Sequence, residues 1–358
     1  MRYTDVLLDD IRAQIQPDDT VVKEAKQRRE IVLAGAAIHG FSQETVRSGS
    51  LAHGTAICPI HRRDKGLDAD GAVVLPPWAW LTLGPETATN QPPNGVVESF
   101  RVAVEKYVRA HGYPRATATT EGMKRAILVK FHEPLPGGED PTVDLIVGLP
   151  RTAGGLWIPN LTNRRWDPSH PEKHTSMFLG PDSQKQLRVL RARSVRLAKA
   201  ENKRTDPAAL CSFNIEALAI LYITQLMPLS RALHTLWLRG GLDLAQRLTP
   251  DPAGVSADIK VRDRQGASRR WLGNARQLDT ALQLDGLSTT PATSGAIQDA
   301  LRPLWPEYVP DRTGGTSQAR LVAALQQGRP LRANAQGGLS TTSGTVLKRP
   351  QSFGDTGK

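Results

Sequence analysis

The sequence has few of the features that stabilise secreted or membrane proteins. Only two of its 358 residues, Cys58 and Cys211, are cysteines, which excludes a disulfide-bonded secreted scaffold. No apolar run approaches the roughly 18 residues that a membrane span needs, and residues 1–5 do not begin a signal peptide. No repeat of fixed period is present, which excludes a solenoid. We therefore expect a cytoplasmic protein in a reducing compartment, without a membrane partner.

Metal-binding motifs built from cysteine and histidine are equally scarce. Cys58 and His61 form a single Cys–His pair without a second pair at the spacing of a zinc site. A structural zinc ion is almost always held by four such ligands. We therefore expect no structural zinc.

Length and charge set the scale of the protein. With 39% hydrophobic residues the chain can bury a sizeable core, and we expect two packed lobes followed by a tail. The formal net charge of +11 favours anionic partners such as nucleotides or nucleic acid. Residues 313–358 contain six lysines and arginines against one aspartate. This concentration of charge in the last part of the chain weakens the case for a folded RNA-binding surface.

Three aspartates in two strand-like segments give the strongest chemical signal. Asp68 and Asp70 flank Ala69 at the start of an apolar run, so both side chains project from the same face of a strand. Asp144 lies within the β-branched run 141–147, where an ionised side chain is costly without a partner. Carboxylates so close together repel unless a cation lies between them, and hard oxygen ligands suit Mg²⁺ or Mn²⁺. On neighbouring strands, the three aspartates could hold two such ions.

Two glycine-containing steps precede the paired aspartates. Gly49-Ser50 supplies a flexible backbone and a hydroxyl that can hold phosphate oxygens, and Gly54-Thr55 follows a few residues later. An isolated Asp-x-Asp pair is more often a solvated strand end or turn. The combination with the glycine steps and a third aspartate favours a metal-dependent nucleotide site.

This combination resembles the nucleotidyltransferase superfamily related to DNA polymerase β, and within it the bacterial CD-NTases, relatives of cyclic GMP-AMP synthase. The resemblance rests on Gly49-Ser50, Gly54-Thr55, Asp68, Asp70 and Asp144. It implies an α+β fold, with a mixed-sheet nucleotidyltransferase core and a mainly helical C-terminal lobe. The sequence departs from the family pattern at Gly71-Ala72, where a straight aliphatic run is expected.

The resemblance also implies roles for residues outside the aspartate strands. Lys199 and Ser212 would contact the triphosphate of the donor nucleotide, and Phe213 would stack on its base. Lysine supplies a point charge for phosphates, a serine near a helix N-terminus suits an anion, and an aromatic face accepts any purine. Phe213 is equally compatible with a packing role in the core.

Hydrophobic periodicity and turn residues divide the chain into elements. Helices are predicted at residues 3–14, 18–38, 96–111, 182–203, 212–226, 229–248, 274–284, 294–304 and 317–327. Strands are predicted near residues 45–47, 67–75, 116–119, 126–132, 141–147 and 154–159, and a polar loop at 163–179. We assign residues 1–165 to the nucleotidyltransferase core with N-terminal helices, 166–328 to a helical lobe that completes the nucleotide-binding cleft, and 329–358 to a flexible tail.

By resemblance, the protein is expected to be an enzyme that makes a cyclic di- or trinucleotide second messenger from ATP and/or GTP in anti-phage defence signalling. Asp68, Asp70 and Asp144 would ligate two Mg²⁺ or Mn²⁺ ions, and Gly49, Ser50 and Thr55 would bind the nucleotide. A defence-system partner would act on the C-terminal tail, and a plain disordered end is the alternative. Two other functions stay open: a nucleotidyltransferase that modifies RNA or protein, and a non-catalytic RNA-binding scaffold. Nucleic-acid binding is compatible with the charge but not required.

Overall fold

The computed structural model describes residues 2–58, 66–86, 90–205, 207–286 and 290–309. It also describes three two-residue strands, β8 (Arg332–Ala333), β9 (Leu339–Ser340) and β10 (Thr345–Val346). The predicted helix at 317–327 and the rest of the predicted tail at 329–358 lie outside the described residues. Within the described ranges, no helix combines the length and the apolar character needed to cross a membrane.

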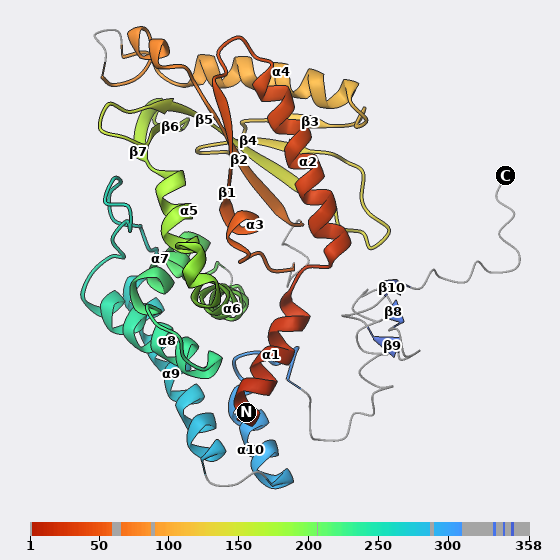
Figure 1. Cartoon of the computed structure of the whole chain (residues 1–358), viewed down its shortest axis with the longest axis vertical. Helices are drawn as coiled ribbons and strands as arrows, with labels where there is room; N and C mark the ends of the chain where they lie inside the picture. The colour runs from red at the N-terminus through yellow and green to blue at the C-terminus, as the bar shows by residue number, and fades with distance from the viewer. Residues whose placement is uncertain are drawn as a thin grey trace, which may run out of the picture.

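A seven-stranded mixed sheet forms the first lobe (Figure 1). Its strands are β1 (Glu44–Ser48), β2 (Asp68–Val74), β3 (Thr117–Thr119), β4 (Ile127–Lys130), β5 (Thr142–Pro150), β6 (Leu156–Asn160) and β7 (Arg165–Ser169). The spatial order is β1-β2-β5-β4-β3, and β6 pairs with both β5 and β7. β2 and β5 are parallel, whereas the other pairs of this sheet are antiparallel. The two strands that carry the predicted aspartates are therefore direct neighbours.

Two long helices, α2 (Asp19–Ala37) and α4 (Asn94–Ala110), pack against the sheet and against each other (Figure 1). Apolar residues recur at helical spacing on the buried side of α4, where Val97, Phe100 and Val104 lie in the same hydrophobic core as the inner side chains of the sheet. This core fixes β2 and β5 from one side.

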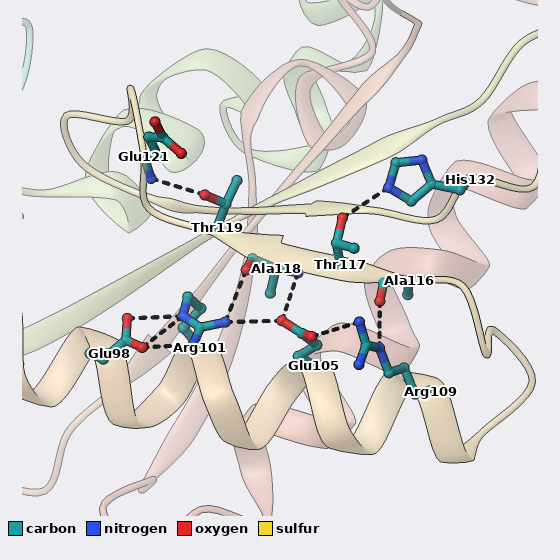
Figure 2. A network of polar contacts seen from close by, with 10 residues as sticks. All are labelled: Glu98, Arg101, Glu105, Arg109, Ala116, Thr117, Ala118, Thr119, Glu121 and His132. Carbon is teal, nitrogen blue, oxygen red and sulfur yellow. Dashed lines mark hydrogen bonds and ion pairs between the residues drawn. The ribbon is translucent and has the colours of Figure 1, made fainter.

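Polar contacts also join α4 to the edge strand β3 (Figure 2). Arg101 donates to the carbonyl oxygen of Ala118, and the amide of Ala118 donates to the carboxylate of Glu105, each at 3.1 Å. Arg109 donates to the carbonyl oxygen of Ala116 at 2.7 Å. These side chains satisfy backbone groups that an edge strand would otherwise expose.

A second hydrophobic core holds a helical lobe together. Its helices are α1 (Tyr3–Ile15), α5 (Pro171–Leu179), α6 (Lys185–Asn202), α7 (Ser212–Tyr222), α8 (Leu229–Gln246), α9 (Arg264–Asp285) and α10 (Pro291–Leu301). Trp237, Trp271 and Trp305 are among its largest fully buried side chains. Although α1 precedes the sheet in the sequence, its apolar residues belong to this second core.

Within the described residues the predicted elements are present with bounds that differ by up to about three residues, and larger differences lie at four places. Residues 163–179 were predicted as a loop, but they form β7 and α5, and His170 caps α5 by accepting a hydrogen bond from the amide of Lys173 at 3.3 Å. α9 begins at Arg264 rather than at 274, because Asp263 caps it through the amide of Gly266 at 2.8 Å. α7 ends at Tyr222, before the predicted end at 226. The helix α3 (Gly49–His53) was not predicted. Together with two short 3₁₀ helices, Pro77–Leu81 and Asp182–Gln184, it completes the described elements.

Candidate active site

The parallel pairing of β2 and β5 brings Asp70 and Asp144 side by side. The two residues are partners in the register, and Asp68 is the partner of Thr142. Neighbouring strands lie about 4.8 Å apart, so facing carboxylates on one side of a sheet interact directly. Asp68 is the exposed first residue of β2, and it accepts a hydrogen bond from the hydroxyl of Thr142.

Burial and mutual repulsion raise the pKa of both neighbouring aspartates. Desolvation, with the charges of Asp144 and Asp68, raises the pKa of Asp70 from 3.8 to about 7. Desolvation, followed by the charge of Asp68, raises the pKa of Asp144 to about 6. The Oδ1 atom of Asp144 is buried and accepts no hydrogen bond from the described residues. Carboxylates in this situation are stabilised by a cation between them.

The donor chemistry of the three aspartates fits a hard divalent cation, since all the available atoms are carboxylate oxygens. In the described ranges, however, no group of three His, Cys, Asp or Glu side chains is spaced to hold a metal ion as it stands. One oxygen of Asp68 accepts a hydrogen bond from the hydroxyl of Thr142 and so already has a protein partner. A metal ion bound by Asp68 would compete with this hydrogen bond.

The short helix α3 (Gly49–His53) approaches Asp70 directly after β1. Ser48, the last residue of β1, is the register partner of Asp70. Gly49 has a φ of +75°, and a Cβ atom at this position would lie 1.8 Å from Oδ2 of Asp70. Only glycine permits this conformation and this approach. The structure thus brings Gly49 and the partly exposed Ser50 to the predicted aspartates.

Lys199 lies in a buried polar cluster at the other end of α3. Its Nζ atom donates to Oε1 of Glu216 at 2.6 Å and to Oγ1 of Thr55 at 3.1 Å. Lys199 is only 3% exposed, and Thr55 is fully buried. The charges of Lys199 and Glu216 both affect the pKa of Asp70, so the cluster lies close to the aspartates. The structure thus joins Lys199 and Thr55, which were both predicted to contact nucleotide, through direct protein contacts.

Glu216 in α7 was not identified from the sequence, although it connects this cluster. Its carboxylate accepts hydrogen bonds from the Thr55 hydroxyl at 2.5 Å and from Lys199, and it lies 2.8 Å from Nδ1 of His53. Burial alone would raise the pKa of Glu216, but Lys199 and His53 more than offset this effect and hold the pKa well below its usual range. A single carboxylate within the apolar run 215–219 is the signal that could have identified it.

Ser212 and Phe213 begin α7, one turn before Glu216. Ser212 is exposed, and Phe213 is half-buried with its ring 4.8 Å from the ring of His174. His174 is held in place by Asp251, whose Oδ1 lies 2.5 Å from Nε2 of His174. Ser212 and Phe213 begin α7, and His174 lies in α5, so all three residues belong to the helical lobe.

Comparison with solved structures identifies the fold, whereas no family model and no curated protein matches the sequence. The structure is similar to the Bradyrhizobium diazoefficiens CD-NTase CdnG in complex with GTP, with a TM-score of 0.63 and 15% identity over 86% of this chain and 96% of that chain. It is similar to CdnC of E. coli MS115-1 with ATP, with a TM-score of 0.56 and 14% identity over 87% of this chain and 99% of that chain. Vibrio cholerae DncV cyclic AMP-GMP synthase in complex with a linear intermediate gives a TM-score of 0.54 and 11% identity, over 86% of this chain and 88% of that chain. The α+β fold expected from the sequence is confirmed, and it is the fold of the CD-NTases.

Proposed function

We propose that the protein is a CD-NTase, a nucleotidyltransferase that links nucleotides from ATP and/or GTP into a cyclic di- or trinucleotide. The observation that carries this proposal is the pairing of Asp70 with Asp144 on parallel strands, with Gly49 packed against Asp70. The structural neighbours support it, because they include complexes with GTP, with ATP and with a linear intermediate of a cyclic AMP-GMP synthase.

The three aspartates are the residues that would hold two Mg²⁺ or Mn²⁺ ions. When bound, such ions lower the pKa of an attacking hydroxyl and neutralise charge on the triphosphate. Asp144 offers a buried oxygen that has no hydrogen-bond donor among the described residues, and desolvation together with acidic neighbours raises the pKa of Asp70. Both features favour the binding of positive charge beside Asp70 and Asp144, on strands β2 and β5.

The nucleotide is bound by residues on both sides of these aspartates. Gly49 and Ser50 hold the β- and γ-phosphates through backbone N–H groups and the serine hydroxyl. Ser212 contacts the triphosphate from the start of α7, where its side chain is exposed. Lys199 contributes positive charge, since its ammonium lies in the cluster behind α3. Phe213 stacks on the donor base, with His174 against its ring.

From the family resemblance, we also propose that this reaction serves anti-phage defence signalling in the cytoplasm. A defence-system partner would act on the C-terminal tail at residues 329–358. Neither assignment depends on the geometry of the aspartates.

The test is product analysis by mass spectrometry after incubation of the purified protein with all four nucleoside triphosphates and Mg²⁺. A phosphatase-resistant cyclic oligonucleotide of adenosine and/or guanosine is expected, because ring closure leaves no terminal phosphate. Transfer of labelled nucleotide to added tRNA or protein, without a small cyclic product, would indicate the alternative nucleotidyltransferase. Tight RNA binding without turnover of any triphosphate would indicate a non-catalytic scaffold.

A further inference from the structure

Five polar side chains meet where α3 reaches the helical lobe, and we call them the junction cluster. His53 and Thr55 come from the end of α3 and the residues after it, Thr175 comes from α5, Lys199 from α6 and Glu216 from α7. The sequence separation between Thr55 and Glu216 is 161 residues. The cluster therefore joins the two lobes.

Within the cluster, the protein supplies an acceptor for each proton of the Lys199 ammonium group. This group has three protons, and three acceptors surround it: Glu216 Oε1 at 2.6 Å, Thr55 Oγ1 at 3.1 Å and the carbonyl oxygen of Thr55 at 3.4 Å. Glu216 is 6% exposed. Of these three acceptors only Glu216 is charged. Glu216 therefore determines where the ammonium group of Lys199 lies.

His53 extends the cluster from Glu216 to α5. Its Nδ1 atom lies 2.8 Å from Oε2 of Glu216, and its Nε2 atom lies 3.0 Å from the hydroxyl of Thr175. The ionised carboxylate of Glu216 can only accept, so Nδ1 of His53 carries the proton. The ring also stacks on Phe178 of α5, with centroids 5.1 Å apart. The last residue of α3 is thereby held by two helices of the other lobe.

A buried ion pair of this kind is weak evidence for stability, because desolvation of the charges offsets most of their attraction. Its position relative to α3 suggests a different role. α3 spans only residues Gly49–His53, with Gly49 against Asp70 at one end and His53 in the cluster at the other. A displacement of His53 and Thr55 would shift the whole short helix, and with it the approach of Gly49 to Asp70.

We propose that Glu216 is a positioning residue that holds Lys199, Thr55 and His53, and through them fixes α3 against Asp70. Its effect on nucleotide turnover rests on the proposed function, because Gly49 and Ser50 of α3 are assigned to the phosphates there. Its effect on α3 itself does not. Turnover and the mobility of α3 therefore test separate parts of the proposal.

The first test compares Glu216→Gln with Glu201→Gln, a matched control. Glu201 is a buried carboxylate of α6 that pairs with Arg270 at 2.6 Å, outside the junction cluster. In Glu216→Gln, hydrogen exchange at the amides of residues 49–55 is expected to become at least about tenfold faster, because α3 loses its anchor. In Glu201→Gln, exchange at the same amides should stay within about twofold of wild type, although the protein loses a buried ion pair. Unchanged exchange of residues 49–55 in Glu216→Gln would overturn the proposal, whether or not the wild type turns over nucleotides.

The second test measures steady-state kinetics once the wild type has been shown to turn over nucleoside triphosphates. Glu216→Gln should raise the KM for the triphosphate about tenfold, with a smaller change in kcat, while Glu201→Gln leaves both within about twofold. Because Lys199 is one of the three residues that Glu216 holds, the losses from Glu216→Gln and Lys199→Met should be less than additive in the double variant. Fully additive losses would overturn the assignment of Lys199 as a residue held by Glu216, and wild-type kinetics in Glu216→Gln would refute the role of Glu216 in turnover.

Thr55→Val provides a second variant in case Glu216→Gln does not fold. It removes the hydroxyl that donates to Glu216 at 2.5 Å and keeps the shape of the side chain. It should accelerate exchange in residues 49–55 by a smaller factor, about threefold, since the contacts of Lys199 and His53 with Glu216 remain. Exchange at the wild-type rate in this variant would count against the proposal.

Discussion

Two networks of charged side chains differ in what surrounds them. On α4, the carboxylates of Glu98 and Glu105 pair with arginines one turn away (Figure 2). Glu105 and its arginine partners also bond backbone groups of residues 116–118 at the surface. In the junction cluster, Lys199 and Glu216 come from different helices and are almost completely buried. When side-chain atoms alone are counted, 23% of Arg101 and 52% of Glu98 are exposed, against 4% of Lys199 and 8% of Glu216. The surface network stabilises the edge of the sheet at little cost, whereas the buried one is costly and lies next to the candidate active site.

The carboxylates near the site differ in the charges that lie beside them. Lys199 and His53 lie beside Glu216 and lower its pKa in spite of its burial. Desolvation, followed by neighbouring carboxylates, raises the pKa values of Asp70 and Asp144 to about 7 and about 6. The chain supplies the positive charge for Glu216 itself, while the aspartates favour positive charge from outside the chain.

The largest expected effect is on catalysis, from Asp68→Asn combined with Asp70→Asn. Cyclic product should fall by about a thousandfold or more, because the amides cannot hold the cations that activate the hydroxyl. The melting temperature should stay within a few degrees of wild type, since repulsion between the neighbouring carboxylates is relieved. Mass spectrometry and calorimetry measure the two quantities. Asp9→Asn with Asp10→Asn on α1 is the matched control, and product formation by the active-site variant at the control's rate would refute the metal role.

The next effect is on stability, from Glu216→Ala. Removal of one partner leaves Lys199 as an uncompensated buried charge, and such losses cost about 3–5 kcal/mol of unfolding free energy. Urea denaturation monitored by circular dichroism measures this change. A loss below about 1 kcal/mol, the range of exposed pairs, would show that the two networks are energetically alike.

An intermediate effect concerns the pH dependence of stability through Asp70. Its pKa in the folded protein is raised from 3.8 to about 7, so the folded state binds the proton more tightly than the unfolded state. The stability from this proton is fully present below pH 4 and is lost as the pH rises through 7. Relative to Asp70→Asn, the wild type should therefore lose about 1–3 kcal/mol between pH 5 and pH 8 in a chelating buffer. Thermal denaturation of both proteins at each pH gives the difference, and a difference that is constant or rises with pH would contradict the assignment.

The smallest effect is expected on α4, from Glu105→Gln. The side chain keeps its shape, and the exposed pairs with Arg101 and Arg109 contribute about 0.2–1 kcal/mol each. Unfolding free energy should fall by about 1 kcal/mol or less, and product formation should not change. A loss of turnover comparable to that of the junction cluster variants would remove the distinction between the two networks.

Local signals predicted most of the fold. Asp18 caps α2 through the amide of Thr20 at 2.9 Å, and the apolar runs around residues 68–74 and 142–150 form β2 and β5. The loop predicted at 163–179 was wrong, because Pro168 is compatible with strand β7, which pairs on one side with β6, and Pro171 occupies the first turn of α5. The sequence therefore predicted the ends of a helix correctly where its capping residue was identified.

The candidate site was predicted only in part, for a reason that lies in its contacts. The aspartates and Gly49 are identified by short motifs, and β-sheet pairing brings them together. Glu216 has no motif, and its partners Thr55 and Lys199 are 161 and 17 residues away in the sequence. Such partners are set by the way in which α3 and the residues after it meet the helical lobe, which periodicity along one chain does not specify. The roles assigned to Ser212 and Phe213 stay predictions.

The most direct measurement is the location of Mn²⁺ by anomalous scattering in crystals grown with a non-hydrolysable ATP analogue. We expect anomalous peaks within coordination distance of Asp68, Asp70 and Asp144, with the triphosphate beside Gly49 and Ser50. Mn²⁺ and nucleotide bound away from these carboxylates would contradict the central claim that the aspartates of β2 and β5 form a cation-dependent catalytic site.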